Sequence, residues 1–225
     1  SALAAGCPVI VKAHPAHPGV SELVAHCVLD AAGATGMPEG IFSLLFDPGI
    51  EIGKALVMHE RIAAVGFTGS KKGGLALVKL ATSRHRPIPV FAEMGSVNPT
   101  VVLPGALEQS PGALADALFG SLTMGQFCTN PGLILAVGPS ESFLAHMKAR
   151  FESAKGGCFL TDGIAQTYER QIMALREVNG VEVLSEGASG PALITCDHAV
   201  FVQNPVLAEE IFGPCGLIVR TTSPL

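Results

Sequence analysis

The sequence predicts an α/β fold with a largely parallel sheet. Short apolar runs typical of buried strands alternate along the chain with longer segments whose apolar residues recur at helical spacing. Glycine, proline and small polar residues stand between these segments, where turns are expected. Because parallel strands need long crossover connections, usually helices, this alternation indicates βαβ units.

The first 95 residues predict four strands and three helices. Residues 9–12 form a short apolar strand, and the spacing of Leu23, Val24, Cys27, Val28 and Ala31 predicts a helix with one apolar face that stops at Gly33. The elements expected next are a strand over 41–46, a helix over 50–58, a strand over 62–67, a helix from Ser70 to about Thr82 and a strand over 90–92.

The alternation continues in residues 96–225. We expect a strand over 100–103, a helix capped by Ser110 that runs from Pro111 to near Gly125, and a strand over 133–137. Phe143, Leu144, Met147 and Phe151 mark an amphipathic helix, another helix covers 162–175, and residues 187–190 read as a loop. We place a domain boundary at about residues 94–98, which gives domains of 1–95 and 96–225.

Composition excludes several classes of protein. Apolar residues make up 48% of the 225 residues and charged residues only 15%, which is not the composition of a disordered chain. A net charge of −5 without a basic tract argues against nucleic acid as a partner. We also expect no membrane partner, because no apolar run reaches spanning length, and the absence of a secretory signal predicts a cytoplasmic protein.

The six cysteines share no CxxC spacing, so reduced thiols are expected rather than a disulfide framework. The Cys196-x-His198 pair has no second pair to complete a metal site, and we predict no metal.

Cys128 stands in a loop of small and polar residues, Gly125-Gln126-Phe127-Cys128-Thr129-Asn130-Pro131-Gly132, unlike the other five cysteines. Upstream, Glu93 closes the apolar run that begins at Pro89. A thiol that attacks a carbonyl and a carboxylate that later activates water are the two groups needed for thioester chemistry. The alternatives are a buried structural thiol and a surface carboxylate, although the apolar setting of Glu93 predicts partial burial and a raised pKa.

Phe67-Thr68-Gly69-Ser70 joins a predicted strand to a predicted helix. The free N–H groups at a helix start can hold a pyrophosphate, and Ser70 would add a hydroxyl. Taken alone, the segment also reads as an ordinary serine N-cap. The Gly-x-Gly-x-x-Gly fingerprint of ordinary dinucleotide-binding domains is absent.

These segments resemble the nucleophile, general-base and coenzyme motifs of the aldehyde dehydrogenase superfamily, and Glu209-Glu210-Ile211-Phe212-Gly213-Pro214 resembles a fourth. The resemblance implies that Cys128 is the nucleophile and Glu93 the base of an NAD(P)-dependent oxidation of an aldehyde. It further implies coenzyme-binding roles for Lys12, Gly69, Ser70, Glu210 and Phe212.

The same resemblance bears on the coenzyme. NAD-preferring members commonly have a glutamate three residues after the lysine that matches Lys12, and here that position is Pro15. Since an acidic side chain would repel a 2′-phosphate, NADP is the expected coenzyme and NAD is the alternative.

Substrate follows from Glu93-Met94-Gly95-Ser96-Val97-Asn98-Pro99, where the common family motif is Glu-Leu-Gly-Gly-Lys-Asn-Pro. With Ser96-Val97 in place of Gly-Lys, this segment and the Cys128 loop resemble the sequences of the branch that oxidises α-ketoglutaric semialdehyde (2,5-dioxopentanoate). NADP-linked long-chain aldehyde dehydrogenases share similar features and are the alternative.

By this resemblance, residues 1–95 are part of a Rossmann-like coenzyme-binding domain and residues 96–225 part of an α/β catalytic domain, with Glu93 and Cys128 facing each other across a cleft. The family's Pro-Trp-Asn segment, which carries an oxyanion donor, is missing from a sequence without Trp. We therefore expect a central piece of a longer, homo-oligomeric enzyme, inactive in isolation. Two alternatives remain: a non-catalytic nucleotide-binding module and a CoA-acylating enzyme. The presence of Glu93 disfavours the second, because CoA-acylating members of the family commonly lack this base.

Overall fold

The computed structural model describes residues 2–123, 125–186 and 190–222. The chain divides into two compact units, Ser1–Met94 and Gly95–Leu225, called here the N-terminal and the C-terminal unit.

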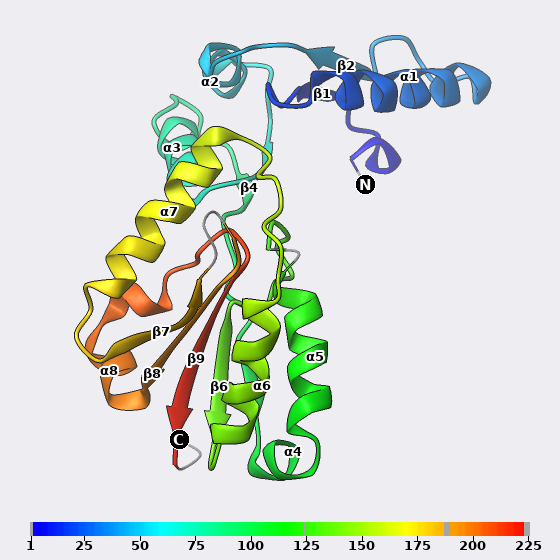
Figure 1. The fold of residues 1–225 in the computed structure, drawn as a ribbon. Helices are drawn as coiled ribbons and strands as arrows, with labels where there is room; N and C mark the ends of the chain where they lie inside the picture. Colours follow the sequence, from blue (N-terminus) through cyan, green and yellow to red (C-terminus); the bar gives the residue numbers. More distant parts are fainter. Residues whose placement is uncertain (1, 124, 187–189, 223–225) are drawn as a thin grey trace. The chain divides into compact units, whose positions relative to one another are not determined.

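The N-terminal unit is built from parallel strand pairs with helical crossovers (Figure 1). Strand β1 (Val9–Lys12) pairs with β2 (Phe42–Leu45) across helix α1 (Pro18–Ala34). Strand β3 (Val65–Thr68) pairs with β4 (Val90–Glu93) across α3 (Lys71–Thr82), and α2 (Glu51–Met58) connects the two pairs. A 3₁₀ turn, η1 (Leu3–Ala5), precedes β1. The predicted alternation of parallel strands and helices is confirmed.

The apolar face predicted for α1 does not face a core. Leu23 and Val24 are 67% and 57% exposed, and the buried residues of the helix are Ala25 and Ala32. Within this unit α1 packs on β2 of a two-stranded sheet, which covers only a narrow, alanine-lined strip of the helix. The predicted stop at Gly33 was one residue early, because α1 ends at Ala34.

The C-terminal unit contains a five-stranded sheet in the order β5-β6-β9-β8-β7 (Figure 1). Its strands are β5 (Thr100–Val102), β6 (Leu133–Val137), β7 (Val181–Glu186), β8 (Ala192–Asp197) and β9 (Cys215–Thr221). All neighbours are parallel except β7, which runs antiparallel to β8 at one edge. The helical segments are α4 (Pro104–Gln109), α5 (Pro111–Leu122), α6 (Glu141–Glu152), α7 (Asp162–Arg176), α8 (His198–Gln203) and the 3₁₀ turn η2 (Pro205–Ala208).

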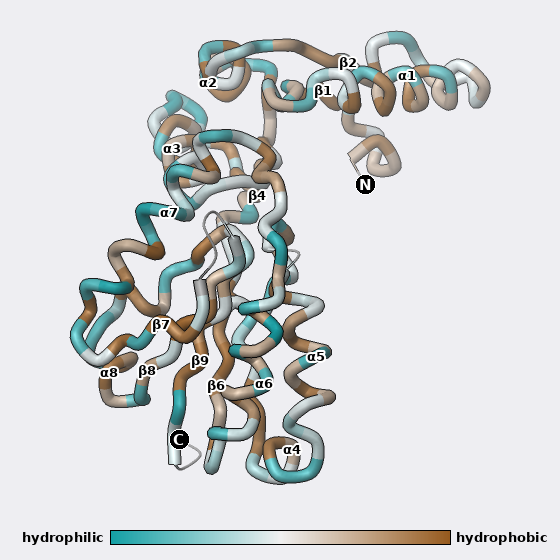
Figure 2. Tube along the Cα trace, in the orientation of Figure 1, coloured by the Kyte–Doolittle hydropathy of each residue, from teal (hydrophilic) through white to brown (hydrophobic). Residues whose placement is uncertain are grey.

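Two apolar clusters cover the two faces of this sheet. Ile134 and Ile218 belong to the cluster with α4, α5 and α6, whereas Leu133 and Leu217 belong to the cluster with α7 and η2. Neighbouring residues of one strand thus alternate between the clusters, as the two-residue period of a strand requires. Figure 1 shows α5 and α6 together on one side of the sheet, and the central strands are largely brown in Figure 2. The sheet is buried on both faces, as parallel sheets usually are.

Some sequence-based boundaries need correction. The helix expected to reach Gly125 ends at Leu122, and Ser110 holds the N-cap position without a side-chain capping bond. Helices α4 and α8 and strands β7, β8 and β9 were not predicted. Of the loop expected over 187–190, residues 187–189 lie outside the described residues. In the part of the chain that the structure describes, no helix combines the length and apolarity needed to cross a membrane.

Candidate functional site

The Cys128 loop, residues 125–132, connects α5 to β6 in the C-terminal unit. Its cysteine lies in a turn and is exposed. A thiol at this position can be reached by a small molecule. The alternative of a buried structural thiol is therefore wrong for Cys128.

The backbone of this loop is held by the segment that follows Gly95. The hydroxyl of Ser96 and the side-chain amide of Asn98 both donate to the carbonyl oxygen of Cys128, the amide from 2.7 Å. The same amide nitrogen lies 3.0 Å from the carbonyl oxygen of Asn130. Asn98 has a φ of 45°, a left-handed conformation that asparagine tolerates better than most residues. The loop is thus fixed at the cysteine and two residues beyond it.

The start of the loop is fixed by packing and by a side-chain clamp. Gly125 has a φ of 57°, and a Cβ atom there would lie 2.6 Å from the carbonyl carbon of Gly213 and closer still to the nitrogen of Pro214. Only glycine fits such an approach of two backbones. The side chain of Gln126 donates to the carbonyl oxygen of Cys158 at 3.1 Å and accepts from the N–H of Leu160 at 2.9 Å.

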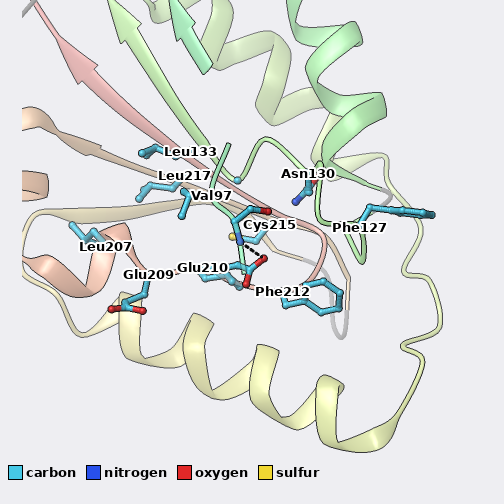
Figure 3. A pocket seen from close by; sticks show the side chains of 14 residues that line it. Val97, Phe127, Asn130, Leu133, Leu207, Glu209, Glu210, Phe212, Cys215 and Leu217 are labelled. Carbon is cyan, nitrogen blue, oxygen red and sulfur yellow. Dashed lines mark hydrogen bonds between the residues drawn. The ribbon is translucent and has the colours of Figure 1, made fainter. Parts of the chain in front are cut away.

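Glu210 also contacts the segment that begins at Gly95. Its carboxylate accepts a hydrogen bond from the N–H of Ser96 at 3.3 Å, drawn as a dashed line in Figure 3. Gly95 has a φ of 114°, and a Cβ there would lie 2.5 Å from Glu210 Oε2. The amide of Gln171 on α7 donates to the carbonyl oxygen of Glu210 at 2.8 Å, which fixes the backbone. The carboxylate is therefore held in place by its backbone and by its contact with residues 95 and 96.

Figure 3 shows the hollow formed where these segments meet. Val97 lies in the apolar part of its lining, and Glu210 and Phe212 form another part. The ring of Phe127 points away from the hollow. The Oδ1 atom of Asn130, also in the lining, is buried and has no hydrogen-bond partner among the described residues. The lining residues are Ser96, Val97, Gly125, Phe127, Asn130, Gly132, Leu133, Leu207, Glu209, Glu210, Ile211, Phe212, Cys215 and Leu217. The C-terminal unit thus brings the Cys128 loop together with the segment that carries Glu210 and Phe212.

Two other cysteines are buried and are therefore less reactive than an exposed thiol. Cys196 and Cys215 are buried in the sheet, and their burial raises their pKa values to about 11 and about 12. Both therefore stay protonated at neutral pH. Among the described residues, no group of three or more His, Cys, Asp and Glu could hold a metal ion.

In the N-terminal unit, Ser70 is the N-cap of α3 and its hydroxyl accepts from the N–H of Gly73 at 3.2 Å. Gly69 donates its N–H to the carbonyl oxygen of Glu93 at 3.0 Å, so the turn before α3 is tied to the end of β4. The structure therefore brings Gly69, Ser70 and the Glu93 backbone together at the carboxyl ends of β3 and β4.

The partial burial expected for Glu93 is wrong, because its side chain is exposed. Along β4, residues 91 and 93 share one face of the strand, and Phe91 on that face is 70% exposed. Within this unit α3 packs on the opposite face, where Ala92 and Met94 approach Gly74. Glu93 lines a shallow hollow with Gly66, Phe67, Thr68, Phe91 and Ala92.

Lys12 ends β1, in register with Leu45. The imidazole rings of His14 and His17 stack nearby, with their centroids 4.8 Å apart. Burial lowers the pKa of His14, and the positive charges of His17 and Lys12 lower it further. The Lys12 ammonium and the two stacked imidazole rings thus lie close together around the end of β1.

Sequence reasoning missed the supporting residues of the site. Ser96, Asn98, Gln126 and Gln171 act through hydrogen bonds to backbone atoms 30 or more residues away. Such bonds have no local pattern in a sequence. The only signal was the Ser96-Val97 departure from the common family motif.

Parallel strands with helical crossovers, a serine-capped helix start and an exposed thiol in a clamped loop place the chain among the α/β proteins. The chain belongs to the aldehyde dehydrogenase family, whose family model matches residues 1–223.

Two relatives share much of the sequence. The chain is 48% identical over 231 residues to a protein from Azospirillum brasilense named alpha-ketoglutaric semialdehyde dehydrogenase 2, with 98% of this chain and 44% of that protein covered. It is 38% identical to the alpha-ketoglutaric semialdehyde dehydrogenase of Acinetobacter baylyi, over 97% of this chain and 44% of that protein. The chain thus spans less than half the length of these relatives.

Solved structures agree on the fold. The NADP complex of glyceraldehyde-3-phosphate dehydrogenase GapN from Methanocaldococcus jannaschii superposes with a TM-score of 0.80 at 22% identity, over 99% of this chain and 50% of that one. Betaine aldehyde dehydrogenase from Staphylococcus aureus gives 0.79 at 20% identity, over 99% and 47%. The α/β fold predicted from the sequence, with parallel sheets of the aldehyde dehydrogenase type, is confirmed.

Proposed function

We propose that the complete natural protein carrying this chain oxidises an aldehyde to its carboxylate with NAD(P)⁺, through a thioester on Cys128. The observation that carries the proposal is the exposed thiol in a loop whose backbone is clamped on both sides, next to the segment that carries Glu210 and Phe212. Family membership supports the reaction class.

The residues assigned to the coenzyme fit a negatively charged dinucleotide. The start of α3 offers backbone N–H groups and the Ser70 hydroxyl, with two lysines at its first two positions. The carboxylate of Glu210, fixed beside Gly95, can accept hydrogen bonds from ribose hydroxyls. When bound, the nicotinamide supplies a hydride acceptor. Pro15, which places no acidic group beside a 2′-phosphate, and the positive charge of Lys12 support NADP over NAD.

In the proposed mechanism, the thiolate sulfur of Cys128 forms a bond to the aldehyde carbon, whose oxygen becomes an oxyanion. The backbone N–H of Cys128 donates to that oxygen. After the carbon has lost its hydride, Cys128 holds the acyl group as a thioester. Glu93 then takes a proton from water, the water oxygen bonds to the acyl carbon, and the carbon–sulfur bond breaks to release the acid and restore the thiolate.

For the substrate we propose α-ketoglutaric semialdehyde (2,5-dioxopentanoate), because the relatives at 48% and 38% identity carry that name. A long-chain aldehyde dehydrogenase of an Acinetobacter species is 29% identical over 95% of this chain, and it supports the alternative of a long-chain aldehyde.

The test uses the complete natural protein with each aldehyde and each coenzyme. We expect the reduced coenzyme and the free acid, with 2,5-dioxopentanoate and NADP⁺ preferred. Cys128→Ser should abolish turnover, whereas Glu93→Gln should still give one equivalent of reduced coenzyme before a steady state slowed by about 10²–10⁴-fold.

Turnover that survives Cys128→Ser would contradict the proposal. Acyl-CoA as the product would instead assign the chemistry to a CoA-acylating enzyme. Nucleotide binding without any turnover in the unmodified protein would assign a non-catalytic module.

A further inference from the structure

The carbonyl oxygen of Cys128 receives two hydrogen bonds from one short segment. The Ser96 hydroxyl and the Asn98 amide both donate to it, and the Asn98 nitrogen also lies 3.3 Å from the Ser96 oxygen. A carbonyl oxygen has two lone pairs, so both of its acceptor sites are used. Nothing in this arrangement involves the sulfur, which stays available.

These bonds restrict the position from which the thiol can act. The carbonyl carbon and the Cβ that bears the sulfur are bonded to the same Cα, and the peptide group that contains the carbonyl is planar. Fixing the carbonyl therefore fixes the peptide plane and the position of that Cα, and the clamp on Gln126, two residues earlier, limits the rotation about the Cα–C bond that would turn the Cβ. The second contact of Asn98, to the carbonyl oxygen of Asn130 at 3.0 Å, fixes the chain on the far side of Thr129. The sulfur is left with rotation about the Cα–Cβ bond, which has three preferred rotamers.

Ser96 stands where the common motif has a glycine, which has no donor group in a side chain. The bond from position 96 to the carbonyl of Cys128 is therefore a property of this sequence and not of that motif. Asn98 can add its own bonds because its φ of 45° places it in the left-handed region. We infer that Ser96 and Asn98 are positioning residues that set the Cys128 thiol for its attack, an inference that rests on the proposed function.

The test compares variants that remove the bonds with variants that keep them. Ser96→Gly removes the hydroxyl, and Ser96→Thr keeps it. Asn98→Gly removes the amide but tolerates the left-handed φ, whereas Asn98→Ala removes the amide and also strains the backbone. Ser153→Gly is the matched control, because its hydroxyl makes a bond of the same kind, 2.8 Å to the carbonyl oxygen of Arg150, at the end of α6.

In the complete natural protein, at a temperature well below unfolding, we expect kcat to fall about 10-fold in Ser96→Gly and up to about 100-fold in Asn98→Gly, the range that small misplacements of reacting groups produce. KM for the coenzyme should not change. Ser96→Thr should recover most of kcat and Ser153→Gly should keep it. Asn98→Ala should match Asn98→Gly in kcat but unfold at a lower temperature.

Wild-type kcat in both Ser96→Gly and Asn98→Gly would overturn the inference while leaving the proposed function intact, provided that Cys128→Ser is inactive. A loss of kcat that appears only near the unfolding temperature, or that Ser96→Thr does not recover, would also overturn it, because a purely structural role predicts that pattern. If Cys128→Ser stays active, the proposed function itself fails.

Discussion

The six thiols of this chain differ in their surroundings. Cys7, Cys27, Cys128 and Cys158 are exposed, whereas Cys196 and Cys215 lie in the core of the C-terminal unit. Burial raises the pKa of each core thiol, so its reactive thiolate form is scarce at neutral pH. Chemical modification can therefore distinguish the proposed nucleophile from the buried cysteines without a substrate.

We predict three rates of alkylation by iodoacetamide at pH 7.5. Cys128 should react fastest, because the proposed function requires a nucleophilic thiolate. The other three exposed thiols should react more slowly, and Cys196 and Cys215 should react only after unfolding. Peptide mapping by mass spectrometry over time measures all six in one sample. Equal rates for Cys128 and Cys27 would contradict a nucleophilic role.

Gly125 is a residue at which a single added methyl group would meet backbone atoms of another segment. An added Cβ would overlap the backbone of Gly213 and Pro214, and the φ of 57° would be strained for alanine. We expect Gly125→Ala to lower the free energy of unfolding by about 3 kcal/mol or more.

The control is Gly120→Ala on α5, where a Cβ meets nothing within 4 Å and the backbone is helical. That variant should raise the free energy of unfolding by about 0.5–1 kcal/mol. Denaturant unfolding of both variants measures the difference. A Gly125→Ala variant as stable as the wild type would mean that the Cys128 loop and the backbone of Gly213 and Pro214 can separate at no cost in free energy.

At the scale of elements, α2 depends on a carboxylate that precedes it. Asp47 accepts hydrogen bonds from the N–H groups of Gly49 at 2.8 Å and Ile52 at 2.9 Å. These bonds lower the pKa of Asp47, and the positive charge of Lys12 lowers it further. The stabilisation is present above the ordinary pKa of aspartate, about 4, and is lost as the pH falls through the lower value of the folded state.

Asp47→Asn keeps one acceptor oxygen and replaces the other with a donor. We expect faster hydrogen exchange at the amides of Gly49 and Ile52 in this variant than in the wild type at pH 6. The ratio of the two rates should approach one as the pH drops well below 4, where the wild-type carboxyl is protonated. A ratio that does not depend on pH would show that the charge of Asp47 has no part in holding α2.

Sequence patterns predicted elements well where the pattern was long. The spacing of Phe143, Met147 and Phe151 predicted α6, and these three residues are buried as expected. Strands β8 and β9 were missed, since short apolar runs between polar loops fit several structures equally well. The exposure of Glu93 was also not predictable, because it depends on which face of β4 is covered and not on the residues beside it in sequence.

The candidate site was likewise predictable only in part from the sequence. The positions of Cys128, Ser70 and Glu210 in a loop, at a helix start and beside a glycine-proline turn followed from local motifs. The bonds of Ser96 and Asn98 to the Cys128 carbonyl did not, because they join segments 30 or more residues apart. Asparagine before proline is usually extended, so the left-handed φ of Asn98 opposed the local preference.

At the scale of the whole molecule, the two units differ in the apolar material they bury. Among the described residues of the N-terminal unit, the buried apolar side chains are four alanines and Val57. The C-terminal unit buries Phe143, Leu122, Ile134, Met147 and other large side chains completely. The N-terminal unit also relies on two separate two-stranded sheets, which are marginal structures.

We therefore predict that limited proteolysis of the 225-residue chain with trypsin cuts first within residues 1–94. Within the C-terminal unit, the sites on α6 should be protected, because the cluster that contains α6 must open before this helix can be cut. Lys155, exposed in the loop after α6, is the site expected to be cut first in that unit. Mass spectrometry of the early products identifies the sites. Early cleavage after Lys148 or Arg150 would contradict the difference in stability between the units.

The single tyrosine of the sequence, Tyr168 on α7, gives the chain a built-in optical probe. Its buried hydroxyl lies 3.1 Å from the carbonyl oxygen of Gly190 and 3.2 Å from that of Pro214, and burial raises the pKa of its phenol. Since the sequence has no Trp, ultraviolet fluorescence of the 225-residue chain reports on this one ring, close to the turn that follows Phe212. In an alkaline titration, phenolate absorbance near 295 nm should appear together with the loss of far-ultraviolet circular dichroism, because the ring ionises only when the C-terminal unit opens.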